Sequence, residues 1–172
     1  MGRAWLSLGS NIEPDRNLAE ALRRLRDRFR SVAESHWYRT QAVGFDGADF
    51  INLAVVIETD LDAETLKHWL RALEARQLRD RAQPRLSDRT LDVDIVMFEA
   101  DDSAAGGKSR SSQPAELARA FVLGPLCDLA PELVPPDGDA RTLTQRWQAL
   151  SVTERKSLVR VPGNGADQSS AG

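Results

Sequence analysis

Two aspartates, Asp92 and Asp94, stand two positions apart in the segment RTLDVDI (89–95), which otherwise has the pattern of a β-strand. Side chains alternate across a strand, so both carboxylates share one face and the apolar residues share the other. Carboxylates at this spacing have Cβ atoms roughly 6.5–7 Å apart, which suits binding of one hard cation or of two neighbouring metal ions. Oxygen ligands without a nearby His or Cys favour Mg²⁺ over zinc.

Arginines are concentrated in the stretch that leads to these aspartates. Of the 23 basic residues, 20 are Arg, and six of them precede the pair: Arg71, Arg76, Arg79, Arg81, Arg85 and Arg89. The guanidinium group suits bidentate contacts with phosphate. An acidic pair alone also occurs on solvated strand faces, but carboxylates beside arginines favour phosphoryl transfer, which needs positioning and charge neutralisation. The segment LGSN (8–11) is not a Walker loop, so side chains would have to hold a nucleotide.

The rest of the chain must supply the elements that position these groups. Apolar runs and turn signals predict strands, and leucines at helical spacing predict helices, the second with Asp62 as its N-cap. The strands are expected at 4–8, 31–40, 50–59 and 89–98, and the helices at 14–29 and from 62 to about 76–79. This βαββαβ order predicts an α+β, ferredoxin-like core, with an antiparallel sheet that has helices on one face and leaves the other free.

A C-terminal extension follows the predicted core. The Gly/Ser-rich stretch 99–114 is expected to be a flexible loop. Short helical turns are expected after it, with a last helix at 143–150. We therefore expect a single domain over residues 1–150 and a C-terminal tail at 151–172, partly disordered at its Gly/Ser-rich end.

Composition limits the class of protein. The 172 residues carry a net charge of −3, which argues against a nucleic-acid partner. No apolar run reaches the length of a membrane span and no signal peptide is evident, so we expect a cytoplasmic protein. A single cysteine, Cys127, excludes an internal disulfide and is interpreted as a core residue rather than a nucleophile. A monomer or a weak dimer is expected.

Several short motifs occur together and in order. They are LGSN (8–11), YRT (38–40), DFINLAV (49–55), Glu74, the pair Arg79 and Arg81, RTLDVDI (89–95) and RAFVLGPLCDLAPEL (119–133). Over about residues 4–150 the chain resembles the 6-hydroxymethyl-7,8-dihydropterin pyrophosphokinase family of folate biosynthesis. The resemblance implies Mg²⁺-dependent transfer of pyrophosphate from ATP to the hydroxymethyl group of the pterin, giving AMP and the pterin diphosphate.

The resemblance also implies roles for individual residues. Asp92 and Asp94 would bind two Mg²⁺ ions, and Arg79 and Arg89 would stabilise the transferring group. The residues implied to bind ATP are Glu74, Arg79, Arg81, Arg89 and Arg119. Those implied to bind the pterin are Phe50 and Phe121 as stacking partners, Val43 as a wall, and Thr40 and Asn52 as hydrogen-bonding groups. Gly9, Ser10 and Asn11 are expected to shape a turn near the site.

The chain departs from the family pattern in its loops. A Pro-His motif usual before the position of Arg119 is absent, because Pro114 is followed by Ala115, and the histidines His36 and His68 lie elsewhere. The apolar hairpin usual after the acidic strand is replaced by DDSAAGGKSRSS (101–112). A diverged pterin- or nucleotide-binding paralogue, non-catalytic or of altered specificity, is therefore the alternative. An RNA-binding module on the same scaffold is disfavoured by the acidic charge balance.

Overall fold

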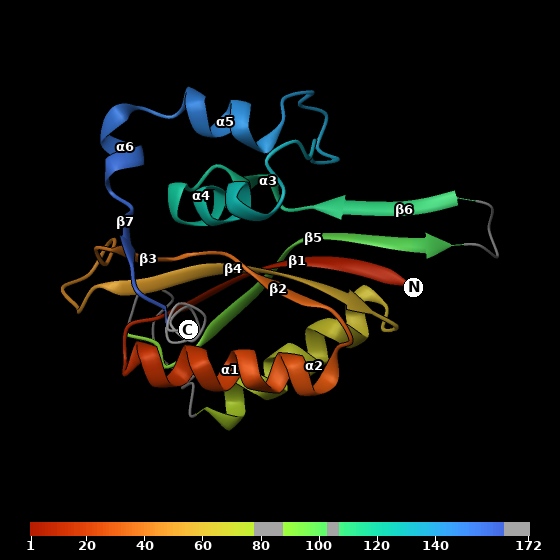
Figure 1. The fold of residues 1–172 in the computed structure, drawn as a ribbon, viewed down its shortest axis with the longest axis horizontal. Coiled ribbons are helices and arrows are strands. Elements are labelled where there is room, and N and C mark those ends of the chain that lie inside the picture. Colours follow the sequence, from red (N-terminus) through yellow and green to blue (C-terminus); the bar gives the residue numbers. More distant parts are fainter. Residues whose placement is uncertain (78–87, 103–106, 164–172) are drawn as a thin grey trace, which may run out of the picture.

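A seven-stranded sheet forms the centre of the molecule in the computed structural model, which describes residues 1–77, 88–102 and 107–163 (Figure 1). The strands are β1 (Gly2–Ser10), β2 (Val32–Glu34), β3 (Trp37–Thr40), β4 (Phe50–Thr59), β5 (Asp92–Asp102), β6 (Gly107–Ser112) and β7 (Val159–Val161). Their order is β6-β5-β1-β4-β3-β7, with β2 also on β4, and every pairing in the described residues is antiparallel.

The ferredoxin-like core matches the prediction. Helices α1 (Pro14–Arg28) and α2 (Ala63–Arg76) lie on the same face of the sheet (Figure 1). Proline occupies the first turn of α1, where its missing N–H costs no hydrogen bond. The side chain of Asp62 accepts a hydrogen bond from the backbone N–H of Thr65 at 2.8 Å, which confirms Asp62 as the N-cap of α2.

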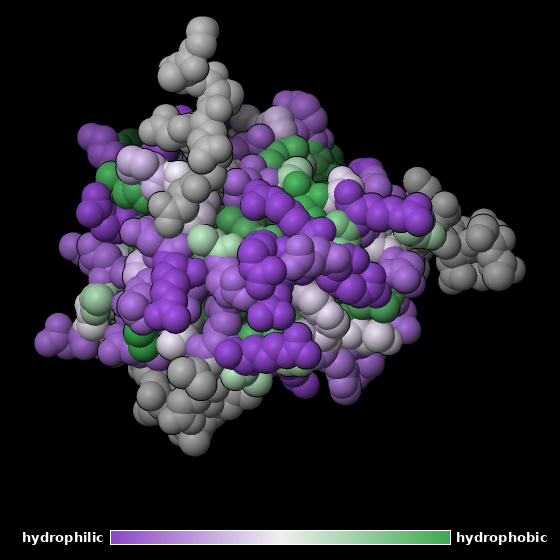
Figure 2. All heavy atoms as spheres, turned by 60° about the horizontal axis from the view of Figure 1, so that its bottom comes forward, coloured by the Kyte–Doolittle hydropathy of each residue, from purple (hydrophilic) through white to green (hydrophobic). Residues whose placement is uncertain are grey.

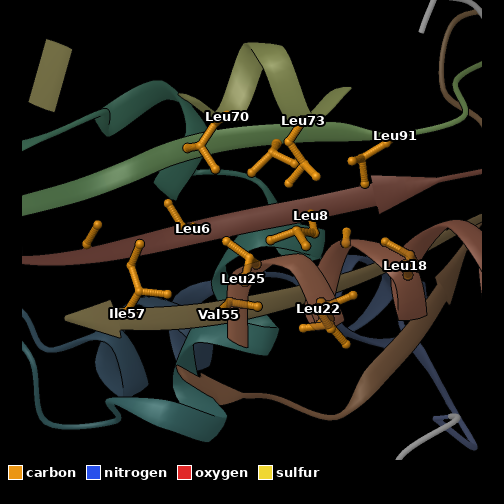
Figure 3. Close-up of a cluster of buried hydrophobic side chains, with 14 of the residues drawn as sticks. Leu6, Leu8, Leu18, Leu22, Leu25, Val55, Ile57, Leu70, Leu73 and Leu91 are labelled. Atoms are coloured by element: carbon orange, nitrogen blue, oxygen red, sulfur yellow. The ribbon is translucent and has the colours of Figure 1, made fainter. Parts of the chain in front are cut away.

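Leucines fill the space between this face of the sheet and the two helices. Alternate residues of β1, Leu6 and Leu8, point toward the helices and are fully buried. They meet Leu18 and Leu25 of α1, and Leu70 of α2 completes the other side of the cluster (Figure 3). Each such side chain contributes about 1.5–3 kcal/mol on burial, so this layer fixes which face of each strand points away from the helices.

The opposite face is not free, contrary to the prediction. Helices α3 (Pro114–Leu117), α4 (Ala120–Leu129) and α5 (Leu143–Ala149) lie over it (Figure 1). A second apolar cluster joins Trp5 and Met97 of the sheet to Val122, Leu123 and Leu126 of α4. The reason is that β1 and β5, where they pair with each other, carry apolar side chains on both faces of the sheet. Those on the face away from α1 and α2 are buried by α4 and its neighbours.

The expected strand at 31–40 is divided in two. Strands β2 and β3 are separated at Ser35 and His36, where the Ser35 hydroxyl accepts a hydrogen bond from the backbone N–H of Ala54 at 2.9 Å. The serine hydroxyl thus accepts a backbone hydrogen bond that a backbone carbonyl would accept in an uninterrupted sheet. Apolar content alone could not locate this interruption.

The expected loop at 99–114 is also corrected. Strand β5 continues to Asp102 and pairs with β6, so most of this polar segment belongs to a hairpin. Glu99 lies opposite Arg110 in the register, and their charged groups approach to 3.5 Å. Opposite charges placed across a strand pair stabilise it even where the residues are polar. Residues 103–106 lie outside the described residues.

The tail expected from residue 151 begins later. Ser151 caps helix α6 (Val152–Lys156) in a capping box with Glu154, and β7 then pairs with β3. Residues 151–161 are therefore part of the fold, while residues 164–172 lie outside the described residues. The predicted helix at 143–150 is confirmed as α5, whose N-cap, Thr142, forms a capping box with Gln145.

Figure 2 shows the molecule with the side that carries α1 and α2 turned forward, and its surface there is mainly hydrophilic with small hydrophobic patches. Among the described residues, no helix combines the length and apolar character that crossing a membrane requires.

Candidate functional site

The two aspartates lie on the sheet face away from α1 and α2. Val93 and Ile95 belong to the leucine-rich cluster with the helices, so Asp92 and Asp94, which alternate with them, point to the opposite face. Asp94 is exposed and Asp92 is partly exposed. The alternation predicted from RTLDVDI is confirmed, and both carboxylates remain accessible because the apolar cluster under α4 is built from other positions.

A row of residues crosses the sheet at Asp92. In register it runs from Asp92 on β5 through Gly9 on β1 and Asn52 on β4 to Tyr38 on β3. Residues in register on antiparallel strands point to the same face, so Asn52 and Asp92 flank the bare backbone of Gly9. With strands about 4.8 Å apart, the backbones of these two residues are separated by roughly 10 Å.

Glu74 holds the acidic strand in place. This α2 residue is 2% exposed, and its Oε1 accepts a hydrogen bond from the backbone N–H of Val93 at 2.8 Å. Val93 lies between the two aspartates, so this bond fixes the backbone that carries both of them. The structure thus gives Glu74 a positioning contact beside the site, and its expected contact with ATP stays a prediction.

Asn11 and Ser10 hold the segment that enters β5. The Asn11 Oδ1 accepts from the Arg89 N–H at 2.7 Å, and the Asn11 N–H donates to the Arg89 carbonyl at 3.1 Å. The Ser10 hydroxyl also lies 3.4 Å from that carbonyl. These contacts fix the Arg89 backbone, from which its Nη1 reaches Asp92 Oδ1 at 3.3 Å. A guanidinium group is therefore held directly beside the acidic pair.

The polar candidates for pterin binding contact each other. The Asn52 Nδ2 donates to Thr40 Oγ1 at 2.8 Å, and both residues are buried. This bond fixes the orientation of the amide and leaves its Oδ1 on the side of Gly9, where an added Cβ would come within 2.8 Å of it. Val43 is 70% exposed in the loop after β3. Roles for all three in substrate binding stay predictions.

The two aromatic candidates lie on different elements on this side of the sheet. Phe50 stands opposite Thr40 in the register, and the Phe45 ring meets it edge to face with centroids 6.3 Å apart. Phe121 lies in the first turn of α4, which covers the same face, and the Arg119 guanidinium lies 5.7 Å from its ring centroid. A cation above an aromatic ring is stabilised by the ring quadrupole.

The donor set at the acidic pair suits magnesium. In the residues that the structure describes, no three or more His, Cys, Asp and Glu side chains gather in a way that could hold a metal ion. Two accessible carboxylates nevertheless match Mg²⁺, which is usually bound through one or two carboxylates, with water and substrate phosphates completing the shell. Zinc would require a fuller set of protein ligands.

Sequence inspection missed a cavity beside Asp94. It has a volume of about 360 Å³ and is lined by α2, the Asp94–Phe98 part of β5 and the segment that ends β6, including Leu70, Arg71 and Gln113. Gln113 donates from its backbone N–H to the Val96 carbonyl at 2.8 Å and from its side chain to the Ile95 carbonyl at 2.5 Å. The cavity depends on the hairpin that the sequence did not predict.

The remaining groups considered from the sequence have contacts of their own or lie outside the described residues, as Arg79 and Arg81 do. His36 contacts Asp128 and His68 contacts Glu64, so both histidines lie in surface contacts. Cys127 is partly buried, and burial raises the pKa of its thiol to about 12, which opposes a nucleophilic role.

Comparisons with known proteins identify a family that matches most of the chain. The model of the family described as 7,8-dihydro-6-hydroxymethylpterin-pyrophosphokinase (HPPK) matches residues 5–131. A Pseudomonas aeruginosa protein named 2-amino-4-hydroxy-6-hydroxymethyldihydropteridine pyrophosphokinase is 36% identical over 165 residues, covering 94% of this chain and 98% of that protein. A protein of the same name from Methylorubrum extorquens is 38% identical over 140 residues, covering 78% of this chain and 86% of that protein.

A solved structure supports the fold. The structure described as Plasmodium falciparum HPPK-DHPS wild type with SDX-DHP aligns with a TM-score of 0.58 and 14% identity. The alignment covers 86% of this chain but only 43% of that longer chain, so the likeness concerns the fold. Taken with the family match and the relatives of similar length, it shows that the chain belongs to the HPPK family of enzymes.

Proposed function

We propose that this enzyme transfers pyrophosphate from ATP to the hydroxymethyl group of 6-hydroxymethyl-7,8-dihydropterin, in a reaction that depends on Mg²⁺ at Asp92 and Asp94. The observation that carries the proposal is the row across the sheet. Asn52 and Asp92 lie on either side of Gly9 on one face of the sheet, with Arg89 held against Asp92. In the proposal, the Asn52 amide would read the heterocycle on one side of Gly9, and the carboxylates would bind a metal–phosphate complex on the other side.

The chemistry needs little from the protein beyond positioning and charge. The pterin hydroxyl oxygen attacks the β-phosphorus of ATP, the bond from that phosphorus to the α-phosphate bridging oxygen breaks, AMP leaves, and the hydroxyl proton is released to water. Magnesium held by Asp92 and Asp94 would neutralise phosphate charge. No protein base is assigned, because the nucleophile is the hydroxyl of the substrate itself.

The chain's own residues would hold the polyphosphate. Arg89 is fixed by Asn11 and lies beside Asp92, so its guanidinium is available near the transferring group without a large ordering cost. A unit charge pair at about 4 Å contributes on the order of 4 kcal/mol at an effective dielectric constant near 20. Arg79, Arg81 and Arg119 are proposed to add further contacts with ATP.

The cavity beside Asp94 is proposed to receive the nucleoside of ATP. Asp94 lines it, and the rest of the lining mixes the apolar Leu70 with polar groups of α2 and β5. Apolar walls with a few polar groups are typical of sites for flat heterocycles. The polyphosphate would then lead from this cavity toward Asp92 and Arg89, and the pterin would lie over Gly9.

The test is product analysis with a matched variant. The purified chain, incubated with ATP, Mg²⁺ and hydroxymethyldihydropterin, is expected to release AMP and pterin diphosphate. Asp94→Ala should abolish this activity with the thermal unfolding temperature preserved, because Asp94 is exposed. Asp60→Ala, which removes an exposed carboxylate paired with Arg28, is the control.

Three outcomes would contradict the proposal. Release of ADP in place of AMP would show transfer of a single phosphoryl group. Full activity of Asp94→Ala would remove the metal assignment. Calorimetric binding of the pterin without product at any Mg²⁺ concentration would favour the alternative, a non-catalytic paralogue.

A further inference from the structure

One carboxylate oxygen gathers three contacts at the far end of the row that crosses the sheet. The Oδ2 of Asp128, in the last turn of α4, accepts from the Tyr38 hydroxyl at 2.8 Å. The same oxygen lies 3.2 Å from the His36 backbone N–H and 3.1 Å from His36 Nδ1. Helix α4 is thus tied by a single side chain to the segment that joins β2 and β3.

The other contacts of α4 with the sheet are apolar. Val122, Leu123 and Leu126 are almost fully buried against Trp5 and Met97. Apolar burial holds the helix on the sheet, but it is non-directional. A hydrogen bond to a charged acceptor has a defined geometry and is among the stronger hydrogen bonds. Asp128 therefore fixes the rotation of α4 and its distance from the sheet, which the apolar layer does not.

The helix links this contact to a site residue. Asp128 follows Phe121 by seven positions, so both lie on the same face of α4, about 10.5 Å apart along its axis. Tyr38 is directly opposite Asn52 in the sheet register. A bond between Tyr38 and Asp128 therefore connects the strand position beside Asn52 to the helix face that carries Phe121.

We propose that Asp128 and Tyr38 are positioning residues for the pterin, holding α4 so that Phe121 covers the face occupied by Asn52, an inference that rests on the proposed function. Neither residue contacts the reacting atoms. Tyr38 supplies the donor, Asp128 supplies the acceptor, and His36 adds a second attachment through its backbone. Loss of the bond leaves the helix attached but no longer fixes its rotation, so the face that carries Phe121 can shift.

The state of the phenol fits this role. Burial, together with the hydrogen bond to the Asp128 carboxylate, raises the pKa of Tyr38 well above its ordinary value. The hydroxyl therefore stays protonated and remains a donor across the neutral range.

The experiment compares Tyr38→Phe and Asp128→Asn with the unchanged protein. Tyr38→Phe removes only the hydroxyl and is expected to raise the pterin KM about tenfold, with the ATP KM changed less than twofold. Asp128→Asn keeps an acceptor oxygen, so its pterin KM is expected to lie between that of the unchanged protein and that of Tyr38→Phe. Glu58→Gln, which alters the exposed pair with Arg3 at the far end of β4, is the control and should change neither constant.

Hydrogen exchange gives a readout that does not depend on catalysis. Amides of residues 120–129 should exchange faster in Tyr38→Phe than in the unchanged protein, while those of α1 should not change. An unchanged pterin KM, or equal increases in the KM for ATP and pterin, would overturn the inference. So would unchanged exchange in α4. If the unchanged protein forms no AMP, the proposed function fails first, and the exchange result then shows separately whether Tyr38 orders α4.

Discussion

Gly9 is the position where a single methyl group should disturb the site most. The Cβ of an alanine there would lie 2.8 Å from the Asn52 Oδ1, closer than real Cβ contacts occur, and 3.8 Å from the Phe50 ring. Asn52 must therefore move. Because its Nδ2 is bonded to Thr40 Oγ1 at 2.8 Å inside the protein, the movement breaks a buried hydrogen bond.

The magnitude follows from two opposing effects. A buried polar pair that loses its bond costs about 1–3 kcal/mol, whereas replacing Gly by Ala within a strand recovers roughly 0.5–1 kcal/mol of backbone entropy. The expected net loss for Gly9→Ala is about 1 kcal/mol in the free energy of unfolding, or roughly 2–4 °C in Tm for a chain of this size. The pterin KM should rise roughly tenfold or more, since the displaced amide no longer meets the ring.

The assays are urea unfolding and steady-state kinetics with each substrate varied in turn. Thr40→Val is the matched comparison, because it removes the same hydrogen bond without adding an atom above β1. Thr40→Val should lower the free energy of unfolding as Gly9→Ala does, but it should raise the pterin KM less than Gly9→Ala. If Gly9→Ala kept both the unfolding free energy and the pterin KM of the unchanged protein, the argument that the bare backbone of Gly9 makes room for Asn52 and substrate would be refuted.

Two further predictions concern regions away from the acidic pair. Arg146→Ala should lower the free energy of unfolding by about 3 kcal/mol, measured by urea titration, because it leaves the buried carboxylate of Asp137 without the guanidinium that contacts it at 2.6 and 2.7 Å. That guanidinium lowers the pKa of Asp137, so its contribution is complete at neutral pH and is lost as pH falls below about 4; equal acid unfolding of Arg146→Ala and the unchanged protein would contradict this. Cys127, whose thiol pKa is raised to about 12 by burial, should react with iodoacetamide at pH 8 far more slowly in the folded than in the urea-unfolded chain, and Cys127→Ala should stay active.

Much of the core followed from local pattern. The period of the leucines predicted both helices, Asp62 predicted the start of α2, and the alternation in RTLDVDI predicted the face on which Asp92 and Asp94 lie. These features depend on neighbours within a few residues, so the sequence contains them directly. The family motifs then identified the family, which physical pattern alone could not have named.

Other features depended on contacts between distant segments. The hairpin of β5 and β6 is largely polar, and its register places Glu99 opposite Arg110, a contact between segments that local pattern did not predict. Strand β7 is three residues long and exists because β3 offers it an edge. Short or polar strands carry little signal of their own, since their partner supplies most of their stability.

The sequence by itself determined the face on which the acidic pair lies and the layer of leucines behind it, because both arise from the alternation and periodicity of neighbouring residues. Only the tertiary structure decided that Gly9 separates Asp92 from Asn52, that Glu74 holds the strand between the two aspartates, and that Asp128 ties α4 to Tyr38. Each of these joins residues far apart in the chain, and register and packing, which no local pattern encodes, bring them together.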